Sequence, residues 1–249
     1  MFYQIICELN EEIYYINYNF VYMPKTTCNL SDCFLCQHCM IEWRPLIGLN
    51  KETRIVKKGK PIFIEGDDVE GIYFVYMGWV KIHKQWTHPK ELIVRFAGPG
   101  DIIGHRGLGE KRNYPVSATA LEDTIVCFVT EDFLESCLRV NPGLTYRLMQ
   151  FYAAELQKAE RRMRDLAHME VKGRLAGALL DMNSKFGTNR DGYISMAASR
   201  QDIASYAGTT YETLFKLFNE LKQDKLISTS GKFIKIKNEV KLHQLLTMK

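Results

Sequence analysis

SRQDIASYAGTTYETLFKLFNELKQDKLIS, residues 199–228, carries the clearest structural pattern in the chain. Ser199 and Asp202 have the spacing of a capping box, so a helix is expected to begin here and to end at Gly208. A second amphipathic stretch, TTYETLFKLFNELKQDK, follows directly over 209–225. Two short helices joined by a tight glycine turn predict a helix-turn-helix.

The residues that follow predict a wing on this motif. LISTSGKFIKIK, residues 226–237, gives two short strands around a Ser230-Gly231 turn. The last 60 residues, 190–249, carry ten Lys and Arg against six Asp and Glu, which equals the net charge of +4 of the whole chain. A basic winged helix indicates a polyanion as partner. Three wing lysines alternate and so share one face of a strand: Lys232, Lys235 and Lys237.

Residues 45–135 have a different pattern, in which short apolar runs are separated by glycine. Such runs with turn signals predict an all-β sandwich or roll. A hairpin is expected with its turn at His88-Pro89-Lys90, between GIYFVYMGWVKIHK and WTHPKELIVRF. The runs are PIFIEGD (61–67), GIYFVYMGWVKI (71–82), LIVRFAGPGD (92–101) and TIVCFV (124–129).

A long helix is expected between the roll and the winged helix, over 141–168, with Pro142 in its first turn. Its apolar positions form a heptad-like stripe. Such a helix can lie on its own β domain or pack on its copy in a second subunit. The length of the stripe favours the second interpretation, a homodimer. The stripe consists of Leu148, Tyr152, Leu156, Ala159, Met163 and Leu166.

These patterns divide the chain into four parts within an α+β fold. They are an irregular cysteine-rich segment over 1–40, a β-roll over 41–140, a dimerisation helix over 141–168 and a winged helix-turn-helix over 169–249. Residues 1–22 read as an extension ahead of a start at Met23. No apolar run reaches the roughly 18 residues of a membrane span, and no export signal is recognisable, so a cytoplasmic protein is expected.

In this order the parts resemble the Crp/Fnr family of bacterial transcription regulators. The resemblance covers about 45–240 and is carried by GDIIGHRGL (100–108), by the 199–228 segment and by GKFIKIK (231–237). It implies a cyclic-nucleotide-binding-like β-roll, a dimerisation helix and a winged helix-turn-helix that binds double-stranded DNA as a homodimer. RNA polymerase is then a further expected partner. No nucleophile or kinase motif accompanies these segments, so an enzyme is not expected.

The resemblance implies that the recognition helix runs from about Thr209 to Asp224, with its first residues at base edges. Glu212 is similar to the family glutamate that accepts a hydrogen bond from cytosine; alternatively, it caps the helix together with Thr209. Lys216 replaces a family arginine and lacks its planar fork. The candidate DNA-binding residues are Ser199, Arg200, Thr209, Thr210, Tyr211, Glu212, Phe215, Lys216 and Lys232.

Cyclic AMP is not an expected ligand. Family members that bind it hold the phosphate with a glutamate and an Arg-Ser pair. Here those places are taken by His105 and by Tyr114-Pro115, so the anion would lose its arginine. Arg106 and Arg112 lie in the same region and could meet another anion or simply solvent.

Four of the seven cysteines lie in CNLSDCFLCQHC, which runs from Cys28 to Cys39. Compact cysteine spacing suits zinc or an iron–sulfur cluster. The Fnr branch holds a [4Fe–4S] cluster with such a group and one distant cysteine, whose place is taken here by Cys127. The expected ligands are Cys33, Cys36, Cys39 and Cys127, with Cys28 as an alternative ligand.

Three alternatives to an iron–sulfur sensor remain. His38 lies inside the cysteine group and could complete a structural zinc site. The cysteines could instead be simple reduced thiols in a regulator that responds to a small effector. A more distant alternative is a cyclic-nucleotide-binding module that does not act on DNA. Cys7 and Cys137 have no partner in the pattern and are expected to be structural.

Overall fold

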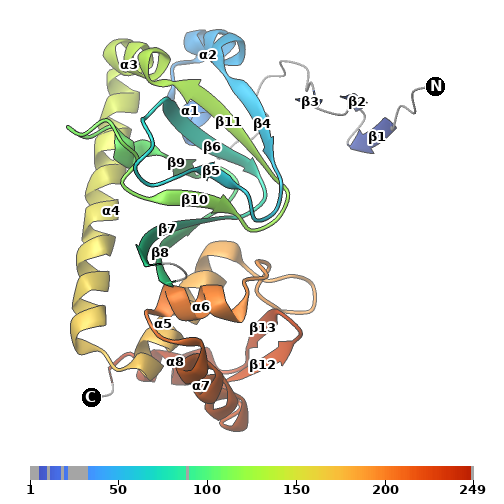
Figure 1. The fold of residues 1–249 in the computed structure, drawn as a ribbon, viewed down its shortest axis with the longest axis vertical. Coiled ribbons are helices and arrows are strands. Elements are labelled where there is room, and N and C mark those ends of the chain that lie inside the picture. Colours follow the sequence, from blue (N-terminus) through green and yellow to red (C-terminus); the bar gives the residue numbers. More distant parts are fainter. Residues whose placement is uncertain (1–5, 10–11, 18–19, 22–32, 88–89, 248–249) are drawn as a thin grey trace.

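The computed structural model describes residues 6–9, 12–17, 20–21, 33–87 and 90–247. Its central part is a β-roll of two four-stranded sheets, with strand orders β5-β10-β7-β8 and β4-β11-β6-β9 (Figure 1). The strands are β4 (Glu52–Val56), β5 (Pro61–Phe63), β6 (Gly71–Met77), β7 (Val80–Thr87), β8 (Lys90–Ala97), β9 (Ile102–Ile103), β10 (Ser117–Ala120) and β11 (Thr124–Thr130).

The position of strand β11 explains why its sequence is apolar at successive positions and does not alternate between apolar and polar residues. Val126 and Phe128 belong to the core between the sheets, whereas Cys127 and Val129 belong to a second buried cluster. Because successive side chains of a strand point to opposite faces, β11 is covered on both sides. The second cluster is packed under helices, which makes it a candidate position for a buried cysteine site.

Helices cover that outer face. They are α1 (Phe34–His38), the short 3₁₀ helix η1 (Ile41–Trp43), α2 (Arg44–Asn50), α3 (Glu131–Val140) and α4 (Pro142–His168). Thr130 caps α3 by accepting a hydrogen bond from the backbone of Phe133, and Pro142 opens α4 as expected. Figure 1 shows α4 running the length of the molecule, beside both the roll and the C-terminal helices.

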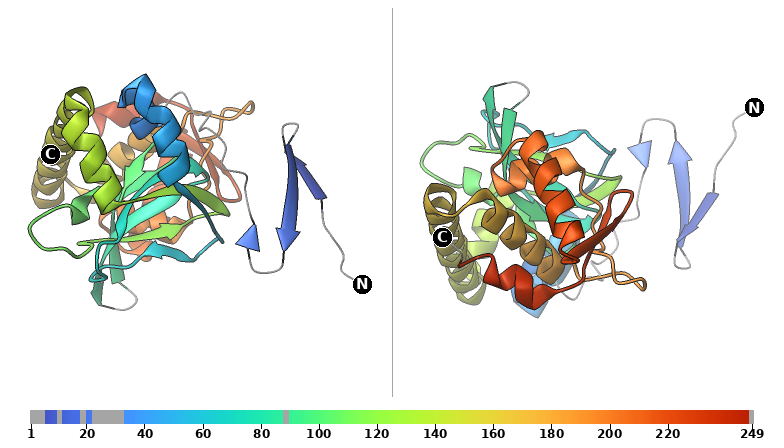
Figure 2. Two further views of the ribbon diagram at one scale, coloured as in Figure 1. Left: turned by 90° about the horizontal axis from the view of Figure 1, so that it is seen from above. Right: turned by 90° about the horizontal axis from the view of Figure 1, so that it is seen from below.

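Two expectations for the N-terminal half were wrong. Residues 1–40 are not simply irregular, because they include a small antiparallel sheet and α1. Figure 2 shows this sheet set apart from the roll; its strands are β1 (Ile6–Leu9), β2 (Glu12–Asn17) and β3 (Phe20–Val21). The run 71–82 is not one arm of a hairpin either. It divides at Gly78 into β6 and β7, which lie in different sheets, and only β7 pairs with β8. His88 and Pro89 of the expected turn lie outside the described residues.

The C-terminal module contains α5 (Val171–Phe186), α6 (Arg200–Ala207), α7 (Tyr211–Gln223), β12 (Ile227–Ser230), β13 (Phe233–Ile236) and α8 (Glu239–Gln244). Helix α5 ends at Phe186, with Gly187 as its C-cap. After the strand pair the chain continues into helix α8, which Asn238 caps by accepting a hydrogen bond from the backbone N–H of Lys241.

The roll and the C-terminal module share one hydrophobic core. Ile93 and Phe96 of β8 belong to the same buried cluster as Leu175 and Leu179 of α5 and Ile203 of α6. The sequence does not show that β8 packs against α5 and α6. The apolar residues of each segment look as if they form the core of that segment alone. The shared core fixes the position of the helix-turn-helix relative to the roll in this conformation.

Candidate nucleic-acid interface and cysteine cluster

The first helix of the helix-turn-helix is built as its sequence predicted. The hydroxyl of Ser199 accepts from the Asp202 backbone N–H at 3.0 Å, and the Ser199 N–H donates to the Asp202 carboxylate at 3.3 Å. The predicted capping box is therefore confirmed. At the other end, Gly208 takes the left-handed conformation with φ +66°, which glycine adopts at little cost.

The second helix begins one residue later than the capping alternative requires. Thr210 is the cap, and its hydroxyl accepts from the Thr213 backbone N–H at 3.3 Å. Glu212 is consequently the second helical residue and not the third. Its pKa is lowered, first by a hydrogen bond from its own backbone N–H and then by the Thr210 side chain, so the exposed carboxylate stays ionised.

Helix α7 has one buried and one exposed face. Leu214, Phe218 and Leu221 are buried in the shared core. The opposite face exposes four residues from two successive helical turns. All four are candidate DNA-binding residues from the sequence: Tyr211, Glu212, Phe215 and Lys216. The amphipathic spacing that builds the helix-turn-helix thus also turns these four side chains toward solvent.

Arg200 connects the two helices with the wing. Its guanidinium lies 4.5 Å from the Phe218 ring centroid and donates to the carbonyls of Gly231 and Lys232 at 3.2 and 3.4 Å. The wing lysines have different positions. Lys232 is exposed, whereas Lys235 donates to the carbonyl of Asp191 at 2.7 Å. Lys232 is therefore better placed than Lys235 to meet a phosphate.

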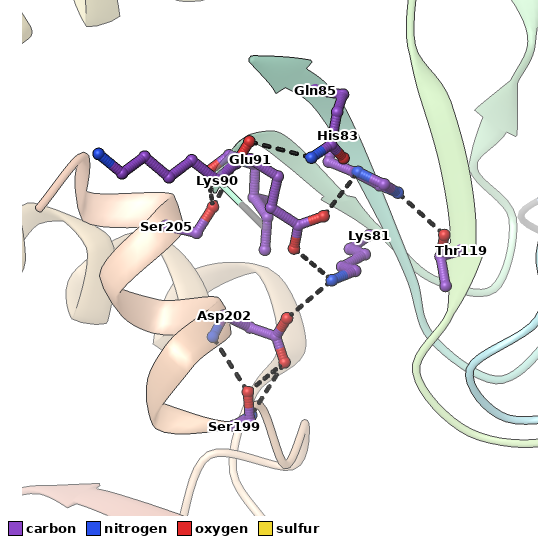
Figure 3. Close-up of polar contacts among 10 residues, drawn as sticks. Lys81, His83, Gln85, Lys90, Glu91, Thr119, Ser199, Asp202 and Ser205 are labelled. Carbon is purple, nitrogen blue, oxygen red and sulfur yellow. Dashed lines mark hydrogen bonds and ion pairs between the residues drawn. The ribbon is translucent and has the colours of Figure 1, made fainter. Parts of the chain in front are cut away.

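A polar network joins the β7–β8 hairpin to α6 (Figure 3). Lys81 lies between two carboxylates, pairing with Glu91 and, at 3.1 Å, with Asp202. On the other side of Glu91, the Nδ1 atom of His83 is 2.8 Å from the carboxylate. Burial would raise the pKa of Glu91, but hydrogen bonds from His83 and Lys81 outweigh it and lower the pKa to about 2.

The backbone of β8 is held by the same helix. The Ser205 hydroxyl donates to the carbonyl of Glu91 at 2.7 Å (Figure 3). It also accepts from the Ile93 N–H at 3.0 Å. From the other side, Arg162 of α4 donates to the carbonyls of Ile93 and Tyr206 at 2.6 and 2.5 Å. The hairpin, α4 and the helix-turn-helix are consequently one connected unit.

The apolar stripe of α4 is only partly exposed. Leu148 is buried in the cluster under the roll's own helices, and Leu166 is half-buried beside Gly208. Met149, which the sequence pattern omitted, is 59% exposed. The exposed apolar residues repeat at spacings of three and four, which is the pattern of a coiled-coil seam. They are Met149, Tyr152, Leu156, Ala159 and Met163.

The expected cysteine ligands share one buried cluster. Cys33, Cys39 and Cys127 are among its buried members, and Cys36 is packed against it. Two elements position them: Cys33 and Cys39 bracket α1, and Cys127 lies in β11 opposite Phe74 of β6. The distant cysteine and the described N-terminal cysteines thus lie in the same buried cluster. Cys28 is outside the described residues.

Cys39 has a specific environment. Its thiol donates to the Asn141 side-chain oxygen at 3.5 Å, and Cys137 lies beside it. Burial raises the pKa of both thiols, that of Cys137 to about 12. Among the described residues, no group of three or more His, Cys, Asp or Glu side chains is arranged to hold a metal ion. The thiols suit a metal site in their chemistry and burial, but Cys39 would have to leave Asn141 to join one.

The interior of the roll is filled with aromatic side chains at the place expected for cyclic AMP. The Phe63 ring stacks on Tyr114 at 4.2 Å and on Tyr73 at 5.6 Å between centroids. His105 is 3% exposed, and burial, followed by Arg95 and Arg106, lowers its pKa to about 3. A neutral histidine does not supply the positive charge of the missing arginine. The absence of cyclic AMP binding stays a prediction.

The two arginines of this region are engaged by carboxylates. Arg106 is 3.5 Å from Glu155 of α4, and Arg112 pairs with Glu131 of α3. They thus connect the roll to its covering helices.

Comparison with known proteins agrees with this architecture. The family model for the cyclic nucleotide-binding domain matches residues 53–141, and that for the Crp-like helix-turn-helix domain matches residues 173–245. A β-roll followed by a winged helix-turn-helix defines a DNA-binding transcription regulator. The chain belongs to the Crp/Fnr family of these regulators.

Several relatives cover most of the chain. The transcriptional activator protein anr of Pseudomonas aeruginosa is 28% identical over 230 residues, which are 88% of this chain and 92% of the relative. The anaerobic regulatory protein of Bacillus subtilis is 31% identical over 186 residues, 73% of this chain and 78% of the relative. The structure of FixK2 from Bradyrhizobium japonicum covers 80% of this chain and 98% of its own, with 28% identity and a TM-score of 0.72.

In the part of the chain that the structure describes, every helix is too short or too polar to cross a lipid bilayer.

Proposed function

We propose that this regulator binds a two-fold symmetric DNA operator as a homodimer, with α7 of each subunit in a major groove. The observation that carries this proposal is the exposed face of α7, which presents Tyr211, Glu212, Phe215 and Lys216 together. A carboxylate can accept from cytosine, and a lysine can donate to guanine. Ser199, Arg200, Thr209, Thr210 and Lys232 are the further candidates for phosphate contact or for the positioning of α7.

The homodimer rests on α4. Its exposed seam repeats like a coiled coil, and an unpaired seam of this length leaves large apolar side chains in water. Leu156 and Met163 are 61% and 65% exposed. Pairing of two α4 helices would bury both and would set the distance between the recognition helices, which must be about 34 Å for one DNA turn.

A salt titration tests the phosphate contacts. The affinity for a DNA duplex should fall steeply with salt, because each neutralised phosphate releases counterions. Lys232→Ala should weaken binding to all duplexes alike and lower the magnitude of the salt slope by about one. Lys60→Ala, an exposed lysine of the roll, is the matched control and should change neither. An unchanged slope for Lys232→Ala would remove the wing from the interface.

We further propose that the cysteine cluster is an iron–sulfur sensor, with Cys33, Cys36, Cys39 and Cys127 as ligands and Cys28 as the alternative. The support is that Cys33, Cys39 and Cys127 are buried in one cluster with the half-buried Cys36 packed against it, together with the similarity to the anr and anaerobic regulatory proteins. A [4Fe–4S] cluster would supply sensitivity to oxygen or nitric oxide. The chain's own contribution is to bring N-terminal thiols against β11 and to keep water out.

Such a site would connect the N-terminal segment to the helix that carries the dimer seam. Asn141, the partner of Cys39, immediately precedes α4 and also accepts from the Met40 N–H at 2.9 Å. Release of Cys39 from Asn141 would change what holds the start of α4. The occupied and empty states would then favour different helix positions, as a switch requires.

Metal and sulfide analysis of anaerobically purified protein tests the sensor. Wild type should contain iron and acid-labile sulfide, and Cys127→Ala should lose both. Cys137→Ala is the matched control, since it removes a buried thiol of the same cluster that is not a proposed ligand. Zinc without sulfide would favour the structural-zinc alternative, and neither metal would favour a regulator that responds to a small effector.

The remaining partners follow from the same proposal. We propose RNA polymerase as a further partner at the promoters that the regulator binds, and the cytoplasm as the compartment in which it meets DNA. We propose no enzymatic activity, because DNA binding by regulators of this family requires none.

A further inference from the structure

We infer that Tyr211 and Phe215 read the methyl groups of thymines in the operator. This inference rests on the proposed placement of α7 in the major groove. It adds the chemistry of the bases that the helix selects.

The two rings form an exposed pair in the first turns of α7. Tyr211 is 42% and Phe215 is 56% exposed. Their centroids are 6.5 Å apart and their planes differ by 24°, so they lie nearly parallel on one face. Within the described chain, neither ring belongs to a buried core cluster, whereas Leu214 and Phe218 of the same helix do. Folding therefore does not account for these two aromatic side chains.

The neighbouring groups indicate what the pair contacts. Glu212 and Lys216 are exposed beside the rings, and Lys232 is exposed on the adjacent wing. Base-pair edges in the major groove present hydrogen-bonding groups and, at thymine, a methyl group. A helix N-terminus that carries apolar rings beside single polar groups is complementary to such edges. In the major groove the thymine C5-methyl group is the one apolar feature of the four bases.

Geometry sets the spacing of the thymines. Residues four apart on a helix are separated by about 6 Å along its axis. Base pairs are spaced at about 3.4 Å, so the two rings reach bases about two steps apart. We therefore expect each half-site to contain two thymines within about two base pairs of each other, beside a C·G pair read by Glu212.

Thymidine and deoxyuridine differ only in the C5-methyl group of the base, which provides the test. Binding sites are first selected with wild-type protein from 40-base-pair duplexes that contain a randomised centre. Wild type and Phe215→Ser are then titrated against the selected duplex and against copies with deoxyuridine at each thymine of the half-site. Phe233→Ser is the control, because Phe233 is a wing ring with a similar exposure of 41%.

Wild type and Phe233→Ser should bind about fourfold more weakly when the methyl at the Phe215 contact is removed. This factor corresponds to the transfer free energy of one buried methyl or methylene group, about 0.8 kcal/mol. Phe215→Ser should bind the two duplexes equally. Equal binding of both duplexes by wild type, or an unchanged methyl effect in Phe215→Ser, overturns the inference and assigns the rings to another partner, such as a protein. A wild-type protein that enriches no duplex overturns the placement of α7 as well.

Discussion

Glu91 links the roll to α6 through Lys81, which pairs with both Glu91 and Asp202. Its pKa is lowered to about 2 from 4.5, so its contribution to stability is complete above pH 4.5 and is lost as the pH falls toward 2. The shift corresponds to a contribution on the order of 3 kcal/mol. Glu91→Gln should lower the free energy of unfolding by about that amount at pH 7.

Denaturant titrations at several pH values check this expectation. The difference between wild type and Glu91→Gln should shrink between pH 4.5 and 2, because the wild-type carboxylate is protonated there. Glu42 is an exposed carboxylate far from the network in sequence, so Glu42→Gln serves as the control. A constant difference at all pH values would mean that the charge of Glu91 is not what stabilises the joint.

Gly208 combines a conformational and a steric requirement. It has φ +66°, and a Cβ atom there would lie 2.5 Å from the Leu166 side chain. Gly208→Ala should cost about 1–2 kcal/mol for the left-handed backbone and about 1 kcal/mol more for the contact. Gly231 has φ +55° with open space around it, so Gly231→Ala should show only the backbone cost. Equal melting temperatures for the two variants would contradict the steric part.

Residue-level signals were predictable where the chemistry is local. The Ser199–Asp202 box and the glycine stop at Gly208 both follow from spacing alone. The capping alternative for α7 was wrong by one residue, because Thr209 and Thr210 are chemically equivalent and only the folded turn selects Thr210. Likewise, nothing in the sequence shows that Arg200 binds the wing carbonyls, since their proximity is tertiary.

At the level of elements, the seam of α4 gives the next prediction. Leu156→Lys should convert the dimer to a monomer, because it places a charge at the centre of the apolar seam. Ala154 is exposed and lies on the face opposite to the seam, so Ala154→Lys should leave the dimer intact. Sedimentation velocity measures both, and a Leu156→Lys protein that remains dimeric would locate the interface elsewhere.

The same helix shows what periodicity can and cannot predict. It located the helix and most of its stripe, but it included Leu148, which is buried in the roll, and omitted Met149, which is exposed. The two positions differ by one residue, or about 100° around the helix. Only the packing against the roll decides which of them faces outward. Tertiary packing also decides the division of 71–82 between two sheets. Gly78 has a positive φ and lies between β6 and β7, which pair with different strands in the folded roll.

On the scale of the whole molecule, the shared core explains how events in the roll can reach the DNA-binding helices. The β7–β8 hairpin and α4 both contact α6 through hydrogen bonds that include Ser205 and Arg162. The sequence predicted the class of both parts and their order, since each carries its own pattern. It did not predict the contact between them, because β8 contributes both to the core of the roll and to the core that the roll shares with the C-terminal module.

The central claim is that two copies of α7 read one symmetric operator. Hydroxyl-radical footprinting of the selected duplex tests this most directly. The account predicts two equivalent protected half-sites with centres about 34 Å apart, one helical turn. Both should be lost together in Leu156→Lys and retained in Ala154→Lys. Protection of a single half-site by wild type, or an unchanged footprint for Leu156→Lys, would contradict the claim.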